Sequence, residues 1–147
     1  MIKEKDLYFL AVKVFLENKG KLFISKDRFG DWDLPGGRLL PAEFNTSFEK
    51  VLARKIKEEL GKNVKYKLGQ PIVFMRHERT EILLDGKKSK RRIFAIGYQA
   101  KYLGGAIQLG KNHEQSKWLE INKLKPEIYF KGGWLKGIKD YLKKTKK

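Results

Sequence analysis

Cysteine is absent from the 147-residue sequence, which excludes disulfides, thiolate nucleophiles and cysteine-based metal sites. This absence fits a reducing compartment, and we expect a cytoplasmic protein. Long apolar runs are missing too: none approaches the ~18 residues that a membrane-spanning helix needs. The N-terminal Met-Ile-Lys-Glu-Lys-Asp contains acidic residues and does not resemble a signal peptide. We therefore expect no membrane association.

Acidic residues are scarce relative to basic ones. Lys and Arg number 34 against 17 Asp and Glu, which gives a formal net charge of +17. A positive surface attracts phosphate-bearing molecules and raises their association rates, so nucleotides are candidate partners, as is weak nucleic-acid binding. Lysine far outnumbers arginine, however, and solubility accounts for such an excess equally well. Charge alone therefore selects no function.

The chain does contain enough apolar material for one folded domain. Hydrophobic residues make up 41% of it and aromatic residues 12%, both ordinary values for a globular protein. A chain of this length buries about two-thirds of its unfolded surface. No repeat or linker interrupts it, so we expect a single domain over residues 1–147 with a short basic tail at about 143–147. The sequence carries no signal for an oligomeric state.

Segments rich in β-branched and aromatic residues predict strands along most of the chain. A hairpin is expected over residues 7–25, and a short strand at Trp32 should end in a sharp bend after Pro35. Further strands are predicted at 64–67, 72–76, 81–84, 93–103, 106–109 and 117–121. A helix over 127–143 is expected to end the chain. This order of elements predicts an α/β (α+β) domain with mixed strands.

The best-defined helix is predicted over residues 47–60. Thr46 is the expected N-cap, because Glu49 follows three residues later at the capping-box spacing. Gly61 lies where a left-handed C-cap residue is expected. At helical spacing, one apolar stripe should pack against the sheet. Its members are Phe48, Val51, Leu52, Ile56 and Leu60.

Lys55 and Glu59 fall inside that apolar stripe, and Glu58 falls at its edge. Burying an unpaired charge is strongly unfavourable, so these groups must be paired, hydrated or bound to a metal. Adjacent Glu58 and Glu59 can flank one hard cation such as Mg²⁺. Alternatively, Lys55 and Glu59 form an i,i+4 ion pair near the edge of the core. The preceding Gly36–Arg38 segment, whose glycines let backbone approach a ligand closely, favours the metal site.

Residues 32–61 resemble the Nudix hydrolase family. Its signature is Gly, five residues, Glu, seven residues, then Arg-Glu-aliphatic-any-Glu-Glu-any-Gly. The first part matches at Gly37 and Glu43. The second part matches at Arg54, Ile56, Glu58, Glu59 and Gly61. The leading Trp-Asp-Leu-Pro-Gly-Gly is typical of the family, and residues 112–119 resemble a late segment in which an acidic residue and His precede a Trp.

The resemblance covers most of the chain and implies an α/β/α sandwich with a mixed sheet between helices. It also implies a pyrophosphohydrolase that cleaves a nucleoside diphosphate linked to another moiety, with Mg²⁺ or Mn²⁺ as cofactor. The implied metal ligands are Glu58, Glu59 and the Gly37 carbonyl. Glu43 is a lesser candidate, either for a second metal ion or for structural support.

The resemblance also implies catalytic roles for Glu59, Glu58 and Arg54. Arg54 would hold a carboxylate in orientation, and the general base would be Glu59 or, second to it, Glu114. Arg38 and Lys55 are candidate phosphate-binding residues. The same role is considered for Arg76, Arg79, Arg91 and Arg92, although solvation alone explains each of them more simply. His113 is expected to be a structural or surface histidine rather than a phosphate contact, and Trp32, Trp118 and Trp134 are expected to pack in the core rather than stack on a base.

Three departures from the signature keep a second function open. Ten residues rather than seven separate Glu43 from Arg54, so Thr46 takes the family Glu position if the gap falls earlier. Lys55 replaces the Glu after the motif Arg, and Asn112 stands where a late acidic residue is expected. Such a lysine either weakens metal binding or replaces one metal ion by contacting phosphate. The alternative is a catalytically impaired Nudix-like domain that binds nucleotide or RNA through its basic surface.

Overall fold

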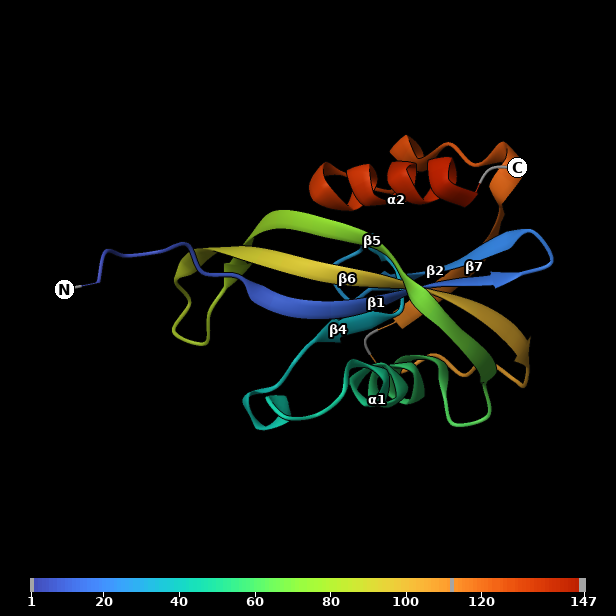
Figure 1. Cartoon of the computed structure of the whole chain (residues 1–147), viewed down its shortest axis with the longest axis horizontal. Coiled ribbons are helices and arrows are strands. Elements are labelled where there is room, and N and C mark those ends of the chain that lie inside the picture. The colour runs from blue at the N-terminus through green and yellow to red at the C-terminus, as the bar shows by residue number, and fades with distance from the viewer. Residues whose placement is uncertain (1, 112, 146–147) are drawn as a thin grey trace.

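The computed structural model describes residues 2–111 and 113–145, and within them a seven-stranded mixed sheet lies between two helices (Figure 1). The predicted α+β sandwich is therefore confirmed. Three short 3₁₀ turns complete the fold. In chain order the elements are β1 (Phe9–Asn18), β2 (Lys21–Asp27), β3 (Trp32–Asp33), β4 (Gly36–Arg38), η1 (Pro41–Glu43), α1 (Phe48–Leu60), β5 (Lys65–Ile82), β6 (Lys88–Gly104), β7 (His113–Glu120), η2 (Ile121–Lys123), η3 (Pro126–Ile128) and α2 (Gly132–Thr145).

Strand β1 is the centre of the sheet. It pairs in parallel with β6, from Phe9 opposite Ile93 to Glu17 opposite Lys101, and antiparallel with β2 and β4. Strand β2 also pairs with β3 and β7, and β5 pairs with β6, all antiparallel. The parallel pair of β1 with β6 makes the sheet mixed. The antiparallel pair of β1 with β4 places Gly36–Arg38 directly beside residues 11–13 of β1.

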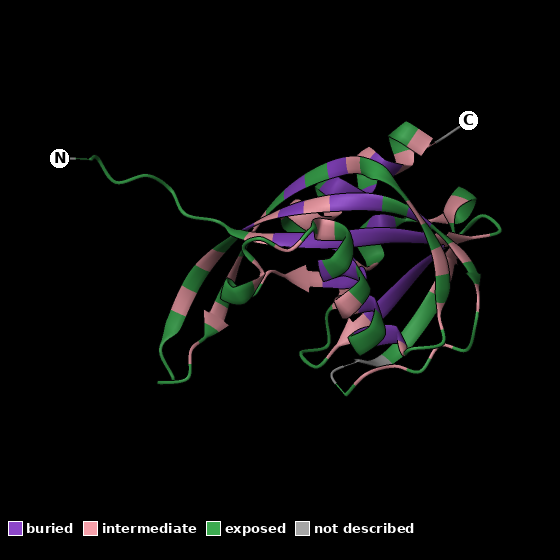
Figure 2. Ribbon diagram, turned by 60° about the horizontal axis from the view of Figure 1, so that its bottom comes forward, coloured by how far each residue is buried: buried purple, intermediate pink, exposed green. Residues whose placement is uncertain are grey.

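Each helix covers a different face of the sheet. Side chains of a strand alternate between faces, so Val12, Val14 and Leu16 pack under α1 while Ala11 and Phe15 pack under α2. The predicted apolar stripe of α1 packs against the strand residues on one face of the sheet. Trp134, Ile138 and Tyr141 of α2 pack against those on the other face. Figure 2 shows the buried residues, in purple, gathered along the central strands. Neither helix in the described ranges has the length and apolar character needed to cross a bilayer.

Helix α1 begins one residue later than predicted, with a different cap. The Ser47 side chain, rather than that of Thr46, accepts a hydrogen bond from the Lys50 N–H at 3.3 Å. Two adjacent hydroxyl residues can each serve as N-cap, and the cap actually used removes the predicted capping box. Gly61 ends the helix at φ 93°, a conformation that favours glycine, but its ψ of 165° is not left-handed helical.

The three strands predicted between residues 64 and 84 form one strand, β5. Its register with β6 shifts between Leu68 and Pro71 and again between Pro71 and Val73. These irregularities absorb the glycine and proline that look like a break in the sequence. No strand forms at residues 106–109, which are within the described part of the chain. There the Gln108 N–H bonds the Leu60 carbonyl, so this segment caps the end of α1.

The C-terminal helix is also shorter than predicted. Only the turn η3 forms at the start of the expected range, and α2 begins at Gly132, whose φ is 55°. A side chain at the next residue, Gly133, would place its Cβ 1.8 Å from the Arg76 carbonyl oxygen. Glycine is therefore required for the start of α2 to lie against β5.

Candidate active site

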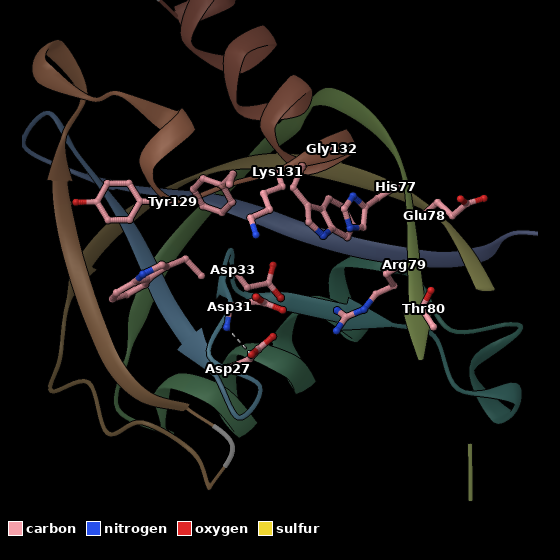
Figure 3. A pocket seen from close by; sticks show the side chains of 13 residues that line it. Asp27, Asp31, Asp33, His77, Glu78, Arg79, Thr80, Tyr129, Lys131 and Gly132 are labelled. Carbon is pink, nitrogen blue, oxygen red and sulfur yellow. Dashed lines mark hydrogen bonds between the residues drawn. The ribbon is translucent and has the colours of Figure 1, made fainter. Parts of the chain in front are cut away.

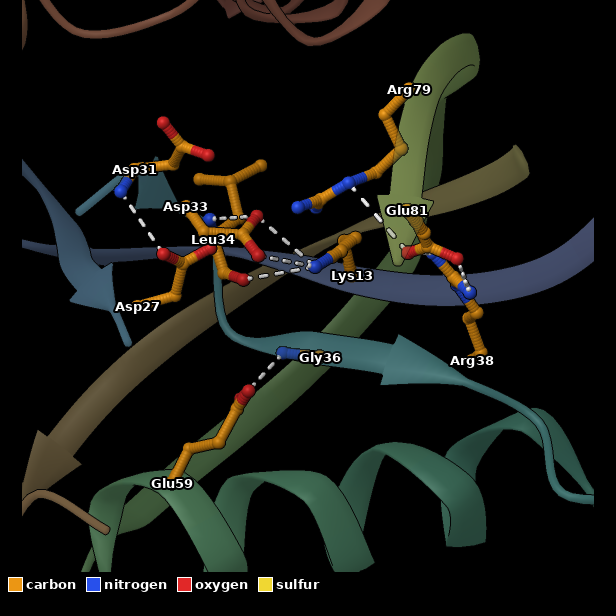
Figure 4. A network of polar contacts seen from close by, with 10 residues as sticks. All are labelled: Lys13, Asp27, Asp31, Asp33, Leu34, Gly36, Arg38, Glu59, Arg79 and Glu81. Carbon is orange, nitrogen blue, oxygen red and sulfur yellow. Dashed lines mark hydrogen bonds and ion pairs between the residues drawn. The ribbon is translucent and has the colours of Figure 1, made fainter. Parts of the chain in front are cut away.

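Strand β4 begins with Gly36 and Gly37 directly after a bend at Pro35, and this glycine bend lies between β1 and α1. Gly36 has φ 134°, and a Cβ there would lie 2.0 Å from the Val12 carbonyl oxygen, so only glycine fits. Its N–H donates a hydrogen bond to Glu59 Oε2 at 3.0 Å (Figure 4). The structure thus brings together the glycine pair and the acidic end of the helix, the two parts of the sequence motif. The Glu59 side chain is buried against this bend.

Glu58 points to more exposed surroundings than Glu59. Its side chain is 51% exposed and accepts hydrogen bonds from Arg54 at 3.1 Å and from Lys55 at 3.3 Å. Partial burial raises the pKa of Glu58, but the hydrogen bonds from Arg54 and Lys55 outweigh it and leave the pKa below its usual value. The ion pair of Lys55 is therefore with Glu58, not with Glu59 as the alternative interpretation supposed.

Glu43 is held by Arg54. Arg54 donates from Nε and a terminal nitrogen to the two carboxylate oxygens, at 2.8 and 2.6 Å. These bonds lower the pKa of Glu43 and raise the pKa of Arg54. The contact forms despite the three added residues, because η1 carries Glu43 back toward α1 and the chain from 44 to 47 connects them. This geometry favours structural support for Glu43 over a second metal site, and Thr46 does not replace it.

Lys55 lies over the glycine bend. Its Cε and Nζ are 2.6 and 3.2 Å from the position that a Cβ on Gly37 would occupy. The ammonium is also paired with Glu58, so it lies between that carboxylate and the bend. This is the region in which the family resemblance places a divalent cation.

The protein oxygen atoms near the bend are too few to surround a metal ion without water or substrate oxygen atoms. Among the residues that the structure describes, no three His, Asp or Glu side chains gather to hold an ion. With Glu43 bound to Arg54, the remaining candidates are Glu58, Glu59 and the Gly37 carbonyl. Mg²⁺ commonly uses one or two carboxylates and completes its shell with water and substrate phosphates. The donor set fits that kind of site and does not fit a closed protein cage.

A cleft opens beside the bend, on the α2 side of the sheet. Its outer part, about 410 Å³, has Asp27, Asp31 and Asp33 on one side and His77 and Arg79 of β5 on the other (Figure 3). A further hollow of about 170 Å³ is lined by the bend itself. The two hollows share Asp33, Arg79 and Trp134, so they are adjacent parts of one cleft. The aromatic members of the outer part are Trp32, Tyr129, Phe130 and Trp134.

Lys13 lies in the inner hollow, and the motif did not identify it. Its side chain is 8% exposed, and Nζ donates to Asp33 Oδ1 and Oδ2 at 3.1 and 2.9 Å and to the Leu34 carbonyl at 3.4 Å (Figure 4). The available sequence signal was a single lysine within the otherwise apolar run from residue 10 to 16. A charge in a buried strand needs a partner, and here Asp33 supplies it.

Two of the candidate arginines line the inner hollow. Arg38 forms a two-pronged ion pair with Glu81, and Arg79 lies 3.7 Å from the same carboxylate. Arg91 instead lies over the ring of Phe9. Arg92 pairs with Asp6 and with Glu78, a residue of the outer cleft, but Arg92 lines neither part of the cleft, and Arg76 lines a separate hollow beside α2. Arg38 and Arg79 therefore line the inner hollow, whereas Arg91 lies near Arg38, over the same Phe9 ring, without lining it.

The tryptophans divide between core and cleft. Trp118 packs edge-on against Phe23 under α1, as predicted. Trp32 and Trp134 pack against the α2-side cluster, but they also line the cleft, which the prediction of core packing does not include.

His77 stacks on Trp134 at 4.5 Å and accepts a hydrogen bond from the Gly133 N–H, and burial lowers the pKa of His77. Asn112 and the side chains of His113 and Glu114 lie outside the described part of the chain.

Comparisons with known proteins agree on the fold. A model of the NUDIX domain family matches residues 7–136. The structure is similar to a MutT protein from Methanosarcina mazei Go1, with 19% identity and a TM-score of 0.74 over 99% of this chain and 100% of that one. An ADP-ribose pyrophosphatase from Streptococcus suis 89-1591 has 15% identity and a TM-score of 0.67 over 96% and 94%. A UDP-X diphosphatase has 15% identity and a TM-score of 0.67 over 99% and 67%.

No curated protein matches the chain in sequence. The family match nevertheless confirms the resemblance seen in the sequence, and with the shared fold it supports the predicted pyrophosphohydrolase. The family implies a nucleotide-derived substrate, and Nudix hydrolases generally use divalent metals.

Proposed function

Because the chain belongs to the NUDIX domain family, we propose that it is a Mg²⁺-dependent pyrophosphohydrolase that cleaves a nucleoside diphosphate linked to another moiety. One observation carries the proposal: a cleft with an aromatic outer part runs to the glycine bend, where Glu59 is bonded to the Gly36 N–H. A ligand with a flat ring at one end and phosphates at the other matches that arrangement.

The two ends of the cleft suit the two ends of such a substrate. Trp32 and Tyr129 present aromatic surface for a nucleobase, since aromatic rings stack on bases. Arg38 and Arg79 border the inner hollow and can place guanidinium N–H groups on the phosphates. Because Glu81 holds Arg38 and lies beside Arg79, both guanidinium groups are positioned before a ligand arrives.

The residues around the bend divide the catalytic work. Glu58, Glu59 and the Gly37 carbonyl would hold Mg²⁺, with phosphate oxygens and water completing its shell. When bound, the ion makes water more acidic and offsets negative charge at the phosphorus. Arg54 fixes the orientation of Glu58. Glu59 would accept the proton as the water oxygen bonds to phosphorus and the bond from phosphorus to the leaving phosphate oxygen breaks.

Phosphate release from a nucleotide panel in Mg²⁺ tests this function. The panel contains ADP-ribose, dinucleoside polyphosphates and nucleoside and deoxynucleoside triphosphates. We expect at least one to be hydrolysed, and we expect Glu59→Gln and EDTA each to remove most of that activity. Glu49→Gln is the matched control, because Glu49 is an exposed glutamate of the same helix. Activity that survives both Glu59→Gln and EDTA contradicts the assignment.

A specific observation favours a second candidate, a domain that binds nucleotide or RNA with impaired chemistry. Both Arg54 and Lys55 already neutralise Glu58, which leaves that carboxylate less available to a metal ion. The same panel separates the two candidates. A binding domain should retain nucleotides in equilibrium dialysis with Mg²⁺ and release no phosphate from any of them.

A further inference from the structure

Lys55 stands where the family signature has a glutamate, and its side chain fills the space between Glu58 and Gly37. The ammonium lies 3.3 Å from Glu58 Oε2 and reaches over Gly37, within 3.2 Å of the point where a Cβ would be. It therefore lies between one candidate metal ligand, Glu58, and the residue that supplies another, Gly37. An ammonium and a divalent ion in the same place repel each other and compete for the same carboxylate.

The ion pair between Lys55 and Glu58 is weak enough for the ammonium to change partner. The Lys55 side chain is 23% exposed and Glu58 is 51% exposed, and exposed ion pairs contribute little to stability. Lysine has a long flexible stem, so the ammonium can move to a nearby acceptor without a change in the helix. Lys55 itself does not line the inner hollow, but Gly37, over which its ammonium lies, does. A phosphate group that reaches Gly37 from this hollow is therefore a nearby acceptor, and phosphate forms strong charge-assisted hydrogen bonds.

We propose that Lys55 is an internal cation that excludes free divalent metal from the site until a nucleoside diphosphate binds. The inference rests on the proposed function for its substrate class. Phosphate draws the ammonium away from Glu58 Oε2, and this oxygen becomes available to an ion that enters with or after the phosphates, while Arg54 still holds Oε1. Nucleotide binding then precedes metal binding, and the first step needs no metal because Lys55 supplies the positive charge.

Titration of Mn²⁺ alone into the full chain tests the first half of the proposal. Wild type should bind Mn²⁺ weakly. Lys55→Glu should bind it roughly tenfold more tightly or better, because the change removes a positive charge and adds a carboxylate at the i,i+3 and i,i+4 spacing from Glu58 and Glu59. Lys57→Glu makes the same charge change at an exposed position of α1 and should behave as wild type. Equal Mn²⁺ affinity in wild type and Lys55→Glu overturns the proposal.

Titration of ADP in EDTA tests the second half. Wild type should bind ADP without metal, and Lys55→Gln should bind it roughly tenfold more weakly or worse, because it loses a charged hydrogen bond to phosphate. Lys57→Gln is the control and should match wild type. No ADP binding by wild type in EDTA, or equal binding by Lys55→Gln, overturns the proposal. Circular dichroism verifies the fold of each variant, and if Lys55→Glu does not fold, Lys55→Gln serves in both titrations.

These binding measurements are independent of turnover. Tight binding of free Mn²⁺ by a wild-type chain that hydrolyses nucleotides would remove the role of Lys55 and leave the proposed function standing. Failure of the whole nucleotide panel, together with the expected pattern in both titrations, would remove the hydrolase function and leave Lys55 as the phosphate contact of a binding domain.

Discussion

Glu58 and Glu59 are neighbours in the sequence, but the fold gives them opposite surroundings. Glu59 is buried and fixed by a backbone N–H of the glycine bend, whereas Glu58 is half exposed and shared between two cationic side chains. A backbone donor cannot move away without a change in the sheet, but a lysine ammonium can. One helix thus presents, side by side, a carboxylate fixed by the backbone and a carboxylate held by side chains.

The largest expected effect separates the two carboxylates by their chemistry. Glu59→Gln should lower kcat by roughly 10³-fold, within the range that a general base contributes, while the Gln amide oxygen still accepts the Gly36 N–H. Glu58→Gln should cause a smaller loss that higher Mg²⁺ concentrations partly recover, because Glu58 is assigned metal binding alone, whereas Glu59 is assigned both metal binding and proton transfer. Steady-state kinetics over a Mg²⁺ series measures both. Equal losses with the same Mg²⁺ dependence would show that the two residues share one role.

The next effect concerns the backbone that fixes Glu59. Gly36→Ala combines a φ of 134° with a Cβ that would lie 2.0 Å from the Val12 carbonyl oxygen. We expect it to lower the free energy of unfolding by about 3 kcal/mol or more. Gly30→Ala is the control, since Gly30 also has positive φ but nothing lies near its added Cβ, and it should cost about 1 kcal/mol. Urea unfolding of both variants gives the difference, and equal losses would exclude the steric explanation.

The smallest effect concerns the ion pair of Glu43 with Arg54, the arginine that also bonds Glu58. The Arg54 hydrogen bonds lower the pKa of Glu43, so the folded pKa lies below the unfolded value of ~4.3. Stability from this pairing is present above that unfolded value and is lost as the pH falls through the folded pKa. Glu43→Gln should therefore lose less stability than wild type between about pH 6 and about pH 3.

Urea unfolding midpoints across this pH series provide the measurement. Glu49→Gln, at an exposed position of α1, the helix that carries Arg54, should follow the wild-type curve. If Glu43→Gln also follows it, the pair with Arg54 makes no contribution in solution.

The α1 side of the site could be predicted because its residues are close in sequence. Gly37, Arg54, Glu58 and Glu59 occupy a short stretch, and helical spacing alone places the last three near one another. The cap was missed by one residue, since Thr46 and Ser47 offer the same hydroxyl chemistry. Sequence spacing allows Lys55 to pair with either Glu58 or Glu59. The observed partner is Glu58, because the choice depends on the direction of the side chains, which spacing does not determine.

The α2 side could not be predicted because it is assembled from distant segments. Lys13 comes from β1, Asp33 from β3, Arg79 from β5 and Trp134 from α2, and only the sheet order brings them together. The sequence predicts several strands in place of β5, because glycine and proline occur both in β-bulges and in loops between strands. Its continuity is what carries Arg79 to the cleft.

The contact between Glu43 and Arg54 also bears on how such motifs are defined. A signature written as fixed gaps counts residues, and by that count this chain fails at the second gap. The fold preserves the contact instead, because the added residues extend an exposed connection between η1 and α1. A signature that specifies which side chains must touch, and lets the loop length vary, would accept Glu43 and leave Lys55 as the departure within the motif.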